Sequence, residues 1–236
     1  MTFDFSIDRI LAVVAHPDDA ELSCTGTLAR AKADGATIGI CVLCRGDKGQ
    51  PDPPIENLVD VRRAEMITAA NVLEAELFEG DFSDGELWDG RVEREKLTEV
   101  YRRFRPTLVL AHAANDYHPD HRAASELSEA ASWLCASKGY GTESVSMDSP
   151  PVLWWMDTIN MHGFSPGFYI DIGEFIKLKR QMIQCHQSQL ARGDSAVFSS
   201  LEELMIRQAE ARGAQCDTAG AEAFQIHTAW KRVRTW

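Results

Sequence analysis

The chain has 236 residues, of which 44% are hydrophobic and 25% are charged, so it is long enough to bury one sizeable core, and a single domain is expected. Its formal net charge of -12 repels a phosphate backbone, and no cluster of Lys and Arg stands out, which argues against a nucleic-acid partner. The longest apolar runs fall short of the roughly 20 residues that span a bilayer. The N-terminus carries neither a basic region nor a small-residue cleavage site, so a cytoplasmic protein without a membrane span is expected.

The first half of the chain alternates apolar runs with helical patterns. The apolar runs are continuous, which is typical of parallel strands covered on both faces. Strands are predicted over 9–15, 37–43, 76–78 and 107–112, and helices over 20–35, 58–76, 93–105 and 119–139. Gly35 is suited to close the first helix, and Pro119 is suited to the first turn of the last.

The second half is less regular. Strands are predicted over 152–156 and 168–172, followed by a long helix over 173–191 and a helical C-terminal extension over about 200–236. No repeat or low-complexity segment marks a second domain. The pattern predicts a single α/β domain with an open, mostly parallel sheet.

Two His-Pro-Asp motifs follow predicted strands, "HPDD" at 16–19 and "HPDH" at 118–121. Ligands of such sheets bind beyond the carboxyl ends of the strands, so both motifs are expected at one rim. Two neighbouring carboxylates repel unless a positive charge lies beside them. His16, Asp19 and His121 are suitable ligands for a divalent cation that leaves one position open, and Asp18 is then the base for its water.

A simpler reading of "HPDD" is a helix start, in which the Asp side chains cap free backbone N–H groups. That reading explains neither the histidine at the strand end nor the second motif. The six cysteines are scattered in apolar or helical stretches, and we expect them to be reduced packing residues.

At these residues the sequence resembles the LmbE-like family, also called PIG-L-type N-deacetylases, whose members carry AHPDDE and a later HPDH. This chain has "AHPDDAEL", with Ala20 before Glu21, and an intact second motif. The resemblance implies a Rossmann-like fold with helices on both faces, a Zn²⁺ site or another divalent first-row metal, a small N-acetylated amino-sugar substrate and a homo-oligomer. It also implies roles for the site residues. His16, Asp19 and His121 would be the metal ligands, and Asp18 would be the general base. His118 would assist the tetrahedral intermediate or the leaving amine, and Asp120 would orient a neighbouring imidazole.

Less specific segments extend the resemblance over roughly residues 9–190. They are "CRGDKG" at 44–49, "RRAEMITAANVL" at 62–73 and "CHQSQ" at 185–189. They supply four candidate substrate-binding residues, which are Arg45, Asp47, Arg62 and His186. The competing reading is that the arginines are solvated surface residues and that the histidine packs beside the site.

The function expected from these motifs is a metal-dependent hydrolase that removes an N-acetyl or related N-acyl group from an amino sugar or small glycoside. Two alternatives stay open. The same two histidines and one carboxylate are the ligand set of non-haem iron oxygenases. The chain is also compatible with a carbohydrate- or nucleotide-binding protein that has lost catalysis.

Overall fold

A computed structural model of the protein describes residues 3–194 and 200–229. Its strands are β1 (Arg9–Val14), β2 (Thr37–Cys44), β3 (Glu76–Phe82), β4 (Leu108–His112), β5 (Val152–Met156), β6 (Phe168–Asp171) and β7 (Ala221–Ile226). Its α-helices are α1 (Asp19–Ser23), α2 (Thr25–Asp34), α3 (Leu58–Val72), α4 (Arg91–Phe104), α5 (Pro119–Leu134), α6 (Ile176–Ile183), α7 (Gln187–Leu190) and α8 (Leu201–Gln215). Short 3-10 helices are η1 (Ile159–Met161), η2 (Gly173–Phe175) and η3 (Ala191–Asp194).

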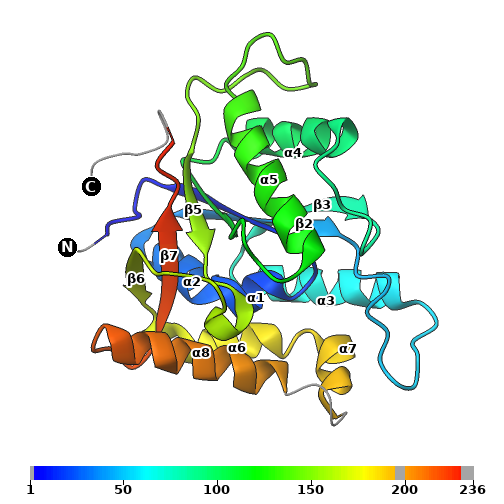
Figure 1. The fold of residues 1–236 in the computed structure, drawn as a ribbon, viewed down its shortest axis with the longest axis vertical. Coiled ribbons are helices and arrows are strands. Elements are labelled where there is room, and N and C mark those ends of the chain that lie inside the picture. The colour runs from blue at the N-terminus through cyan, green and yellow to red at the C-terminus, as the bar shows by residue number, and fades with distance from the viewer. Residues whose placement is uncertain (1–2, 195–199, 230–236) are drawn as a thin grey trace.

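The strands form one seven-stranded sheet in the order β3-β2-β1-β4-β5-β7-β6. Strands β1 to β5 are parallel to one another, whereas β7 runs antiparallel to both β5 and β6. The predicted open, mostly parallel α/β sheet is therefore confirmed (Figure 1). The chain leaves β1 toward β2 on one side and reaches β4 on the other, so the connections change direction between β1 and β4.

Helices cover both faces of the sheet because the strands are apolar on both sides. Alternate residues of β1 enter two different cores: Ile10, Ala12 and Val14 pack with α1, α2, α3, α6 and α8, whereas Leu11 and Val13 pack with α4 and α5. Figure 1 shows α4 and α5 together on one side of the sheet and the other helices on the opposite side. This explains why the central strands carry continuous rather than alternating apolar runs.

The predicted helix over 20–35 is two helices that meet at Cys24, whose φ is -146°. The Lys179 ammonium donates to the Glu21 and Leu22 carbonyls, and the Glu222 carboxylate accepts from backbone N–H groups at the start of α2. Side chains from the C-terminal third of the chain thus form hydrogen bonds with the free carbonyls at the end of α1 and the free N–H groups at the beginning of α2. Gly35 ends α2 in the left-handed conformation, as predicted.

Two further elements differ from the sequence prediction. The long helix over 173–191 is divided into η2, α6 and α7, with His186 at the start of α7. The extension over about 200–236 is helical only in α8, and its described remainder contains β7, which lies between β5 and β6. Ala and Glu in this strand favour helix locally, but pairing with strands on both sides overrides that preference. Residues 230–236 lie outside the described part.

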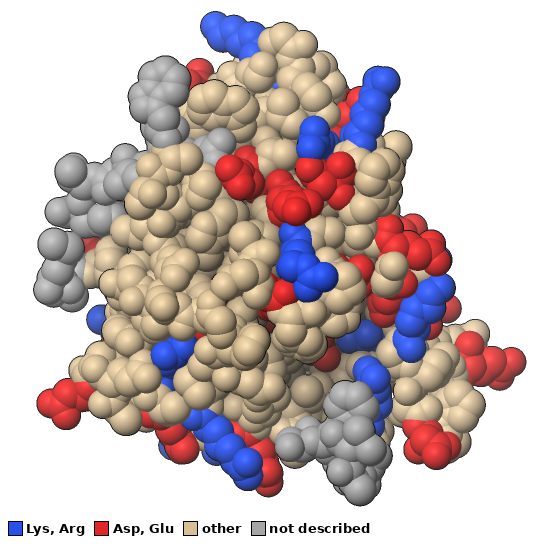
Figure 2. Space-filling model, viewed as in Figure 1, with Lys and Arg blue, Asp and Glu red and all other residues tan. Residues whose placement is uncertain are grey.

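Within the described ranges, no helix is long and apolar enough to cross a membrane. On the face shown in Figure 2, Lys and Arg side chains are interspersed with Asp and Glu rather than gathered in one patch.

Candidate active site

The two His-Pro-Asp motifs meet at the point where the sheet connections change direction. Residues Ile10 to Val13 of β1 pair in parallel with Leu108 to Ala111 of β4, so both strands end at the same edge. The first motif leads from β1 into α1, and the second leads from β4 into α5. The sheet therefore brings together side chains that are about a hundred positions apart, as the motif analysis predicted.

The local backbone at the first motif is unusual. Asp18 has φ 97° and ψ -21°, in the left-handed region that a non-glycine residue seldom occupies. Strained conformations of this kind concentrate at functional sites. The Asp18 side chain caps no N–H of α1, so the capping reading of this residue is not supported. It instead lines a pocket, where the Arg62 Nη2 atom lies 3.5 Å from its Oδ2.

Two of the predicted metal ligands, His16 and His121, lie close to a carboxylate oxygen of the third, Asp19. The Asp19 Oδ2 atom lies 3.3 Å from His16 Nδ1 and 3.3 Å from His121 Nε2. Ligands about 2.0–2.1 Å from a tetrahedral zinc ion lie roughly 3.3–3.4 Å from one another. Each imidazole therefore lies at a distance from the carboxylate oxygen that suits a shared divalent first-row cation, and Asp19, His112 and His121 form another close group of donor atoms. Ligand atoms of His16, His118 and His121 also lie within 4.8 Å of one another.

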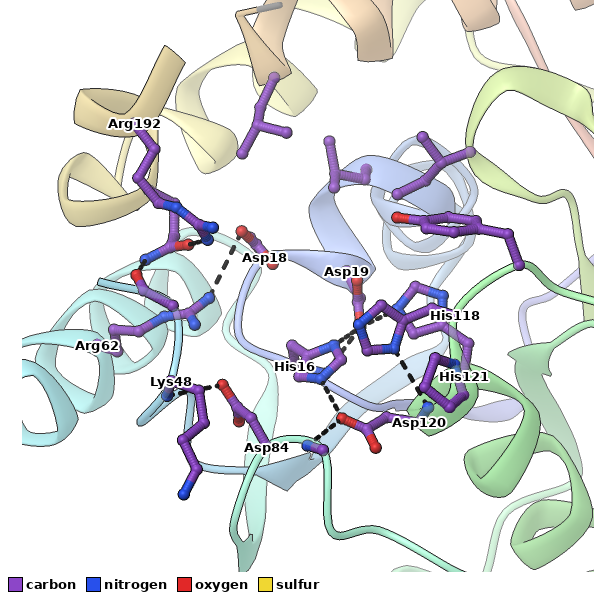
Figure 3. A pocket seen from close by; sticks show the side chains of 18 residues that line it. His16, Asp18, Asp19, Lys48, Arg62, Asp84, His118, Asp120, His121 and Arg192 are labelled. Carbon is purple, nitrogen blue, oxygen red and sulfur yellow. Dashed lines mark hydrogen bonds and ion pairs between the residues drawn. The ribbon is translucent and has the colours of Figure 1, made fainter. Parts of the chain in front are cut away.

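Each candidate imidazole ligand has a carboxylate behind it. The far nitrogen of His16, Nε2, lies 2.9 Å from Asp120 Oδ2, which also accepts the Gly85 backbone N–H. The far nitrogen of His121, Nδ1, lies 3.2 Å from Asp116 Oδ1. Such carboxylates orient a ligating histidine and fix which nitrogen faces the metal. Asp120 therefore lies where the predicted orienting role requires, and its imidazole is that of His16 (Figure 3).

His112 and His118 flank the candidate ligands. His112 is buried at the end of β4, where its Nε2 accepts the Ala15 N–H and its ring stacks on His121 at 4.0 Å. His118 caps α5 by accepting the Asp120 N–H at Nδ1, which leaves Nε2 as the donor atom of the neutral ring. Burial, together with the neighbouring histidines, lowers the pKa of His118.

The cluster attracts positive charge. Burial opposes a charged imidazole, yet hydrogen bonds to Asp120 and Asp19 raise the pKa of His16 to about 10. Burial likewise opposes charge on His121, but Asp19 and Asp116 raise its pKa to about 9. Burial also disfavours the Asp19 carboxylate, yet His121 holds its pKa well below the ordinary value. Buried carboxylates that stabilise nearby protons this strongly also provide a favourable field for a divalent cation.

Asp18 behaves differently from its neighbour. Burial raises its pKa to about 6, even though the Arg62 guanidinium opposes that shift. Two adjacent carboxylates with such different environments are suited to different tasks.

The site opens into a cavity of about 580 Å³. Besides the two motifs, the cavity is lined by Leu22, Lys48, Gly49, Arg62, Asp84, Gly85, Tyr117, Ile159, Gln189, Arg192 and Leu201. Figure 3 shows Lys48, Arg62 and Arg192 on the side of the cavity away from His118 and His121.

Among the four candidate substrate-binding residues, Arg62 lines this cavity. Arg45 lines a separate surface pocket with Glu79 and Lys96. Asp47 accepts from Ser83 Oγ and the Asp84 N–H, so it ties two loops together beneath the cavity rim.

The fourth candidate, His186, is fully buried beneath α1, with its Nε2 3.5 Å from Glu21 Oε2. It lines a very small internal cavity together with Asp18. This position matches the competing reading, in which the histidine packs beside the site.

Several residues of the site were not singled out from the sequence. Asp116 lies two residues before the second motif and offers only one more acid in "NDYHPD" as a signal. Asp84 accepts the backbone N–H groups of Gly46 and Lys48 and lines the cavity. Gln189 and Arg192 reach the cavity from a different part of the chain; Gln189 ends the "CHQSQ" segment, from which only His186 was singled out, and no pattern marks Arg192.

Comparisons with known proteins identify a matching family and similar chains. The family described as PIG-L: GlcNAc-PI de-N-acetylase matches residues 11–132. Diacetylchitobiose deacetylase of Thermococcus kodakarensis is 26% identical over 190 residues, which are 78% of this chain and 70% of that protein. The 4-oxalmesaconate hydratase of Pseudomonas putida is 27% identical over 188 residues, which are 76% of this chain and 73% of that protein.

A solved structure of a conserved protein from Thermus thermophilus superposes with a TM-score of 0.82 at 31% identity, covering 97% of this chain and 98% of that one. N,N'-diacetylchitobiose deacetylase of Pyrococcus horikoshii also superposes with a TM-score of 0.82, covering 94% of this chain and 85% of that one, and at 21% identity it shares the fold. Since the matched segment holds both His-Pro-Asp motifs and spans more than half of the chain, this protein belongs to the PIG-L family.

Proposed function

We propose that this protein is a metal-dependent N-deacetylase that hydrolyses the acetamide of an amino sugar or small glycoside. The observation that carries the proposal is the convergence of His16, His121 and Asp19 beside a second carboxylate, Asp18, at the floor of a cavity. Membership in the PIG-L family and the activity named for the Thermococcus kodakarensis relative support it.

His16, Asp19 and His121 are the residues that would hold the metal. When bound, a divalent cation of this kind polarises a carbonyl and lowers the pKa of water to about 7. Asp120 and Asp116 keep the two imidazoles oriented from behind. Zn²⁺ suits this set of nitrogen and oxygen ligands, and other first-row ions bind the same set.

Asp18 is the proposed general base. Its carboxylate is buried, lines the cavity and lies beside the Arg62 guanidinium, which limits how it can rotate. Its pKa near 6 leaves it ionised at neutral pH and able to accept a proton from water. The same carboxyl group then holds a proton that it can pass to the departing amine.

His118 is the proposed donor to the carbonyl oxygen. Its Nδ1 accepts the Asp120 N–H and its lowered pKa favours the neutral ring, so it acts through Nε2–H. A fixed N–H group of this kind stabilises the negative charge that develops on the oxygen during hydrolysis. Acetate and a free amine are the products.

Elemental analysis of the purified protein and a panel of N-acetylated glycosides, followed by amine formation, test this function. One metal per chain and release of equal amounts of acetate and amine are expected. Oxygen uptake without amine release indicates the oxygenase alternative. Glycoside binding to the metal-loaded protein without turnover indicates the non-catalytic alternative.

The hydratase among the relatives gives a second candidate, because its similarity to this chain equals that of the deacetylase. Cations on one side of the cavity also suit a carboxylate substrate. The same preparation should therefore be assayed with 4-oxalmesaconate. Hydration of that acid without amine release from any glycoside contradicts the deacetylase proposal.

A further inference from the structure

The cavity has two kinds of wall. One part, which we call the polar wall, carries side chains that can form hydrogen bonds, which are Lys48, Arg62, Asp84, Gln189 and Arg192. The other part is apolar and carries Leu22, Tyr117, Ile159 and Leu201, which we call the apolar wall. The proposed catalytic groups border both parts, since Arg62 Nη2 lies 3.5 Å from Asp18 Oδ2 and Tyr117 packs against His118 and His121 at ring distances of 5.9 and 6.0 Å.

The apolar wall is firmly supported. Leu22 lies one turn beyond Asp18 and donates its N–H to the Asp18 carbonyl at 3.0 Å. Leu22, Ile159 and Leu201 belong to one apolar cluster with buried residues of α6 and α8. Three of its four residues therefore belong to a packed core, whereas Tyr117 is 57% exposed and lies outside that cluster.

The chemistry of an amino sugar relates the two walls. In a 2-acetamido sugar the amide is attached to C2, and its ring neighbours are C1 on one side and C3 on the other. When the amide carbonyl lies at Asp18 and His118, the C3 and C4 hydroxyls and the C1 substituent project in opposite directions. Hydroxyls match the polar wall, where carboxylate, amide and guanidinium groups are available.

The C1 substituent then lies against the apolar wall. A charged or hydroxyl-rich group placed there loses hydration and finds only the Tyr117 hydroxyl as a side-chain hydrogen-bond partner on this wall, which is costly. An alkyl or aromatic group gains by leaving water. Building on the proposed function, we propose that the substrate is an N-acylated amino-sugar glycoside whose C1 aglycone is apolar.

A homologous series of alkyl 2-acetamido-2-deoxyglucosides, from methyl to hexyl, tests this substrate class. Each buried methylene is expected to raise kcat/KM about two- to four-fold until the wall is covered. Methyl glycosides with longer N-acyl chains form the second series, and no such rise is expected for them. A flat response to aglycone length, or a rise with acyl length instead, overturns the proposal.

Substitutions in the apolar wall test whether the dependence on alkyl length arises there. Ile159→Ser and Leu201→Ser each remove apolar surface at partly exposed positions, so both proteins are expected to fold. The increase per methylene should fall to less than two-fold in each. Val145→Ser, at a side chain that is 80% exposed and outside the cavity, is the matched control and should keep the parent slope. An unchanged slope in both wall variants overturns the proposal.

Binding measurements distinguish a failure of this inference from a failure of the proposed function. The metal-loaded Asp18→Asn protein is titrated with the same alkyl glycosides, and Kd should fall about two- to four-fold per methylene. If no glycoside releases amine in the parent but Kd still falls with alkyl length, the proposed function fails while the apolar wall stands. If amine is released but neither kcat/KM nor Kd depends on alkyl length, the apolar wall fails alone.

Discussion

At the scale of single residues, Asp18 and Asp19 are neighbours in the chain with different surroundings. Asp19 is surrounded by imidazoles, whereas Asp18 lies beside a guanidinium and faces the cavity. The left-handed backbone of Asp18 separates the two side chains. In the proposed function, Asp19 binds the cation while Asp18 stays available for proton transfer.

Asp18→Asn should lower kcat by about 10²- to 10⁴-fold while the protein keeps its metal. Asparagine suits this test because it tolerates the left-handed conformation and preserves the shape of the side chain. His16→Ala, in contrast, should lose both metal and activity. Turnover and metal content measured on the same preparations separate the two roles. Parent-level activity in Asp18→Asn contradicts the base assignment.

Asp120→Asn should weaken metal affinity about 10- to 100-fold, because the amide cannot orient His16 as the carboxylate does. Competition with a chelator of known affinity measures the change. Asp148→Asn, at a fully exposed side chain that pairs with Arg105, is the matched control. Equal metal affinity in both variants rules out the orienting role of Asp120.

At the scale of elements, side chains from the C-terminal third of the chain contact the short helix α1, which begins at Asp19 directly after Asp18. Lys179 on α6 donates to two carbonyls of α1 and to Glu222 on β7. Lys179 is 1% exposed and Glu222 is 5% exposed. The ammonium lies near the C-terminal end of α1, where a cation is favourable.

Lys179→Met should destabilise the protein by about 3–5 kcal/mol, since it leaves Glu222 buried without its charge partner. Arg212→Met is the matched control, because Arg212 forms a similarly buried pair with Asp157, 2.7 Å apart, on elements other than α1. Denaturant unfolding should report comparable losses for both. At temperatures where both variants are fully folded, kcat should fall more in Lys179→Met than in Arg212→Met. Equal kcat values in the two variants would contradict the inference that Lys179 positions α1.

At the scale of the whole molecule, the proposed cation would link the segment after β1 to the segment after β4, because Asp19 and His121 come from these two segments. A ligand that binds only the folded state adds about 2.7 kcal/mol at a hundred times its Kd. For a chain of this size that corresponds to a rise in Tm of roughly 5–10 °C. Chelation of the metal should lower Tm by this amount, and readdition should restore it.

His16→Ala supplies the control for this measurement, because its Tm should not respond to chelator or metal. A metal-dependent Tm in this variant means that the ion binds elsewhere.

The sequence determined the family, the strand–helix alternation and the identity of the two motifs, because strand burial, helix periodicity and motif spacing are local properties of the chain. Parallel strands end at one edge, so even the meeting of His16 and His121 followed from the pattern. Local pattern did not reveal the strand β7, the break between α1 and α2, or the cavity positions of Arg192 and Leu201. These depend on hydrogen bonds and packing between segments far apart in the chain, where a partner such as Lys179, Glu222 or a neighbouring strand outweighs the preference of the residues themselves.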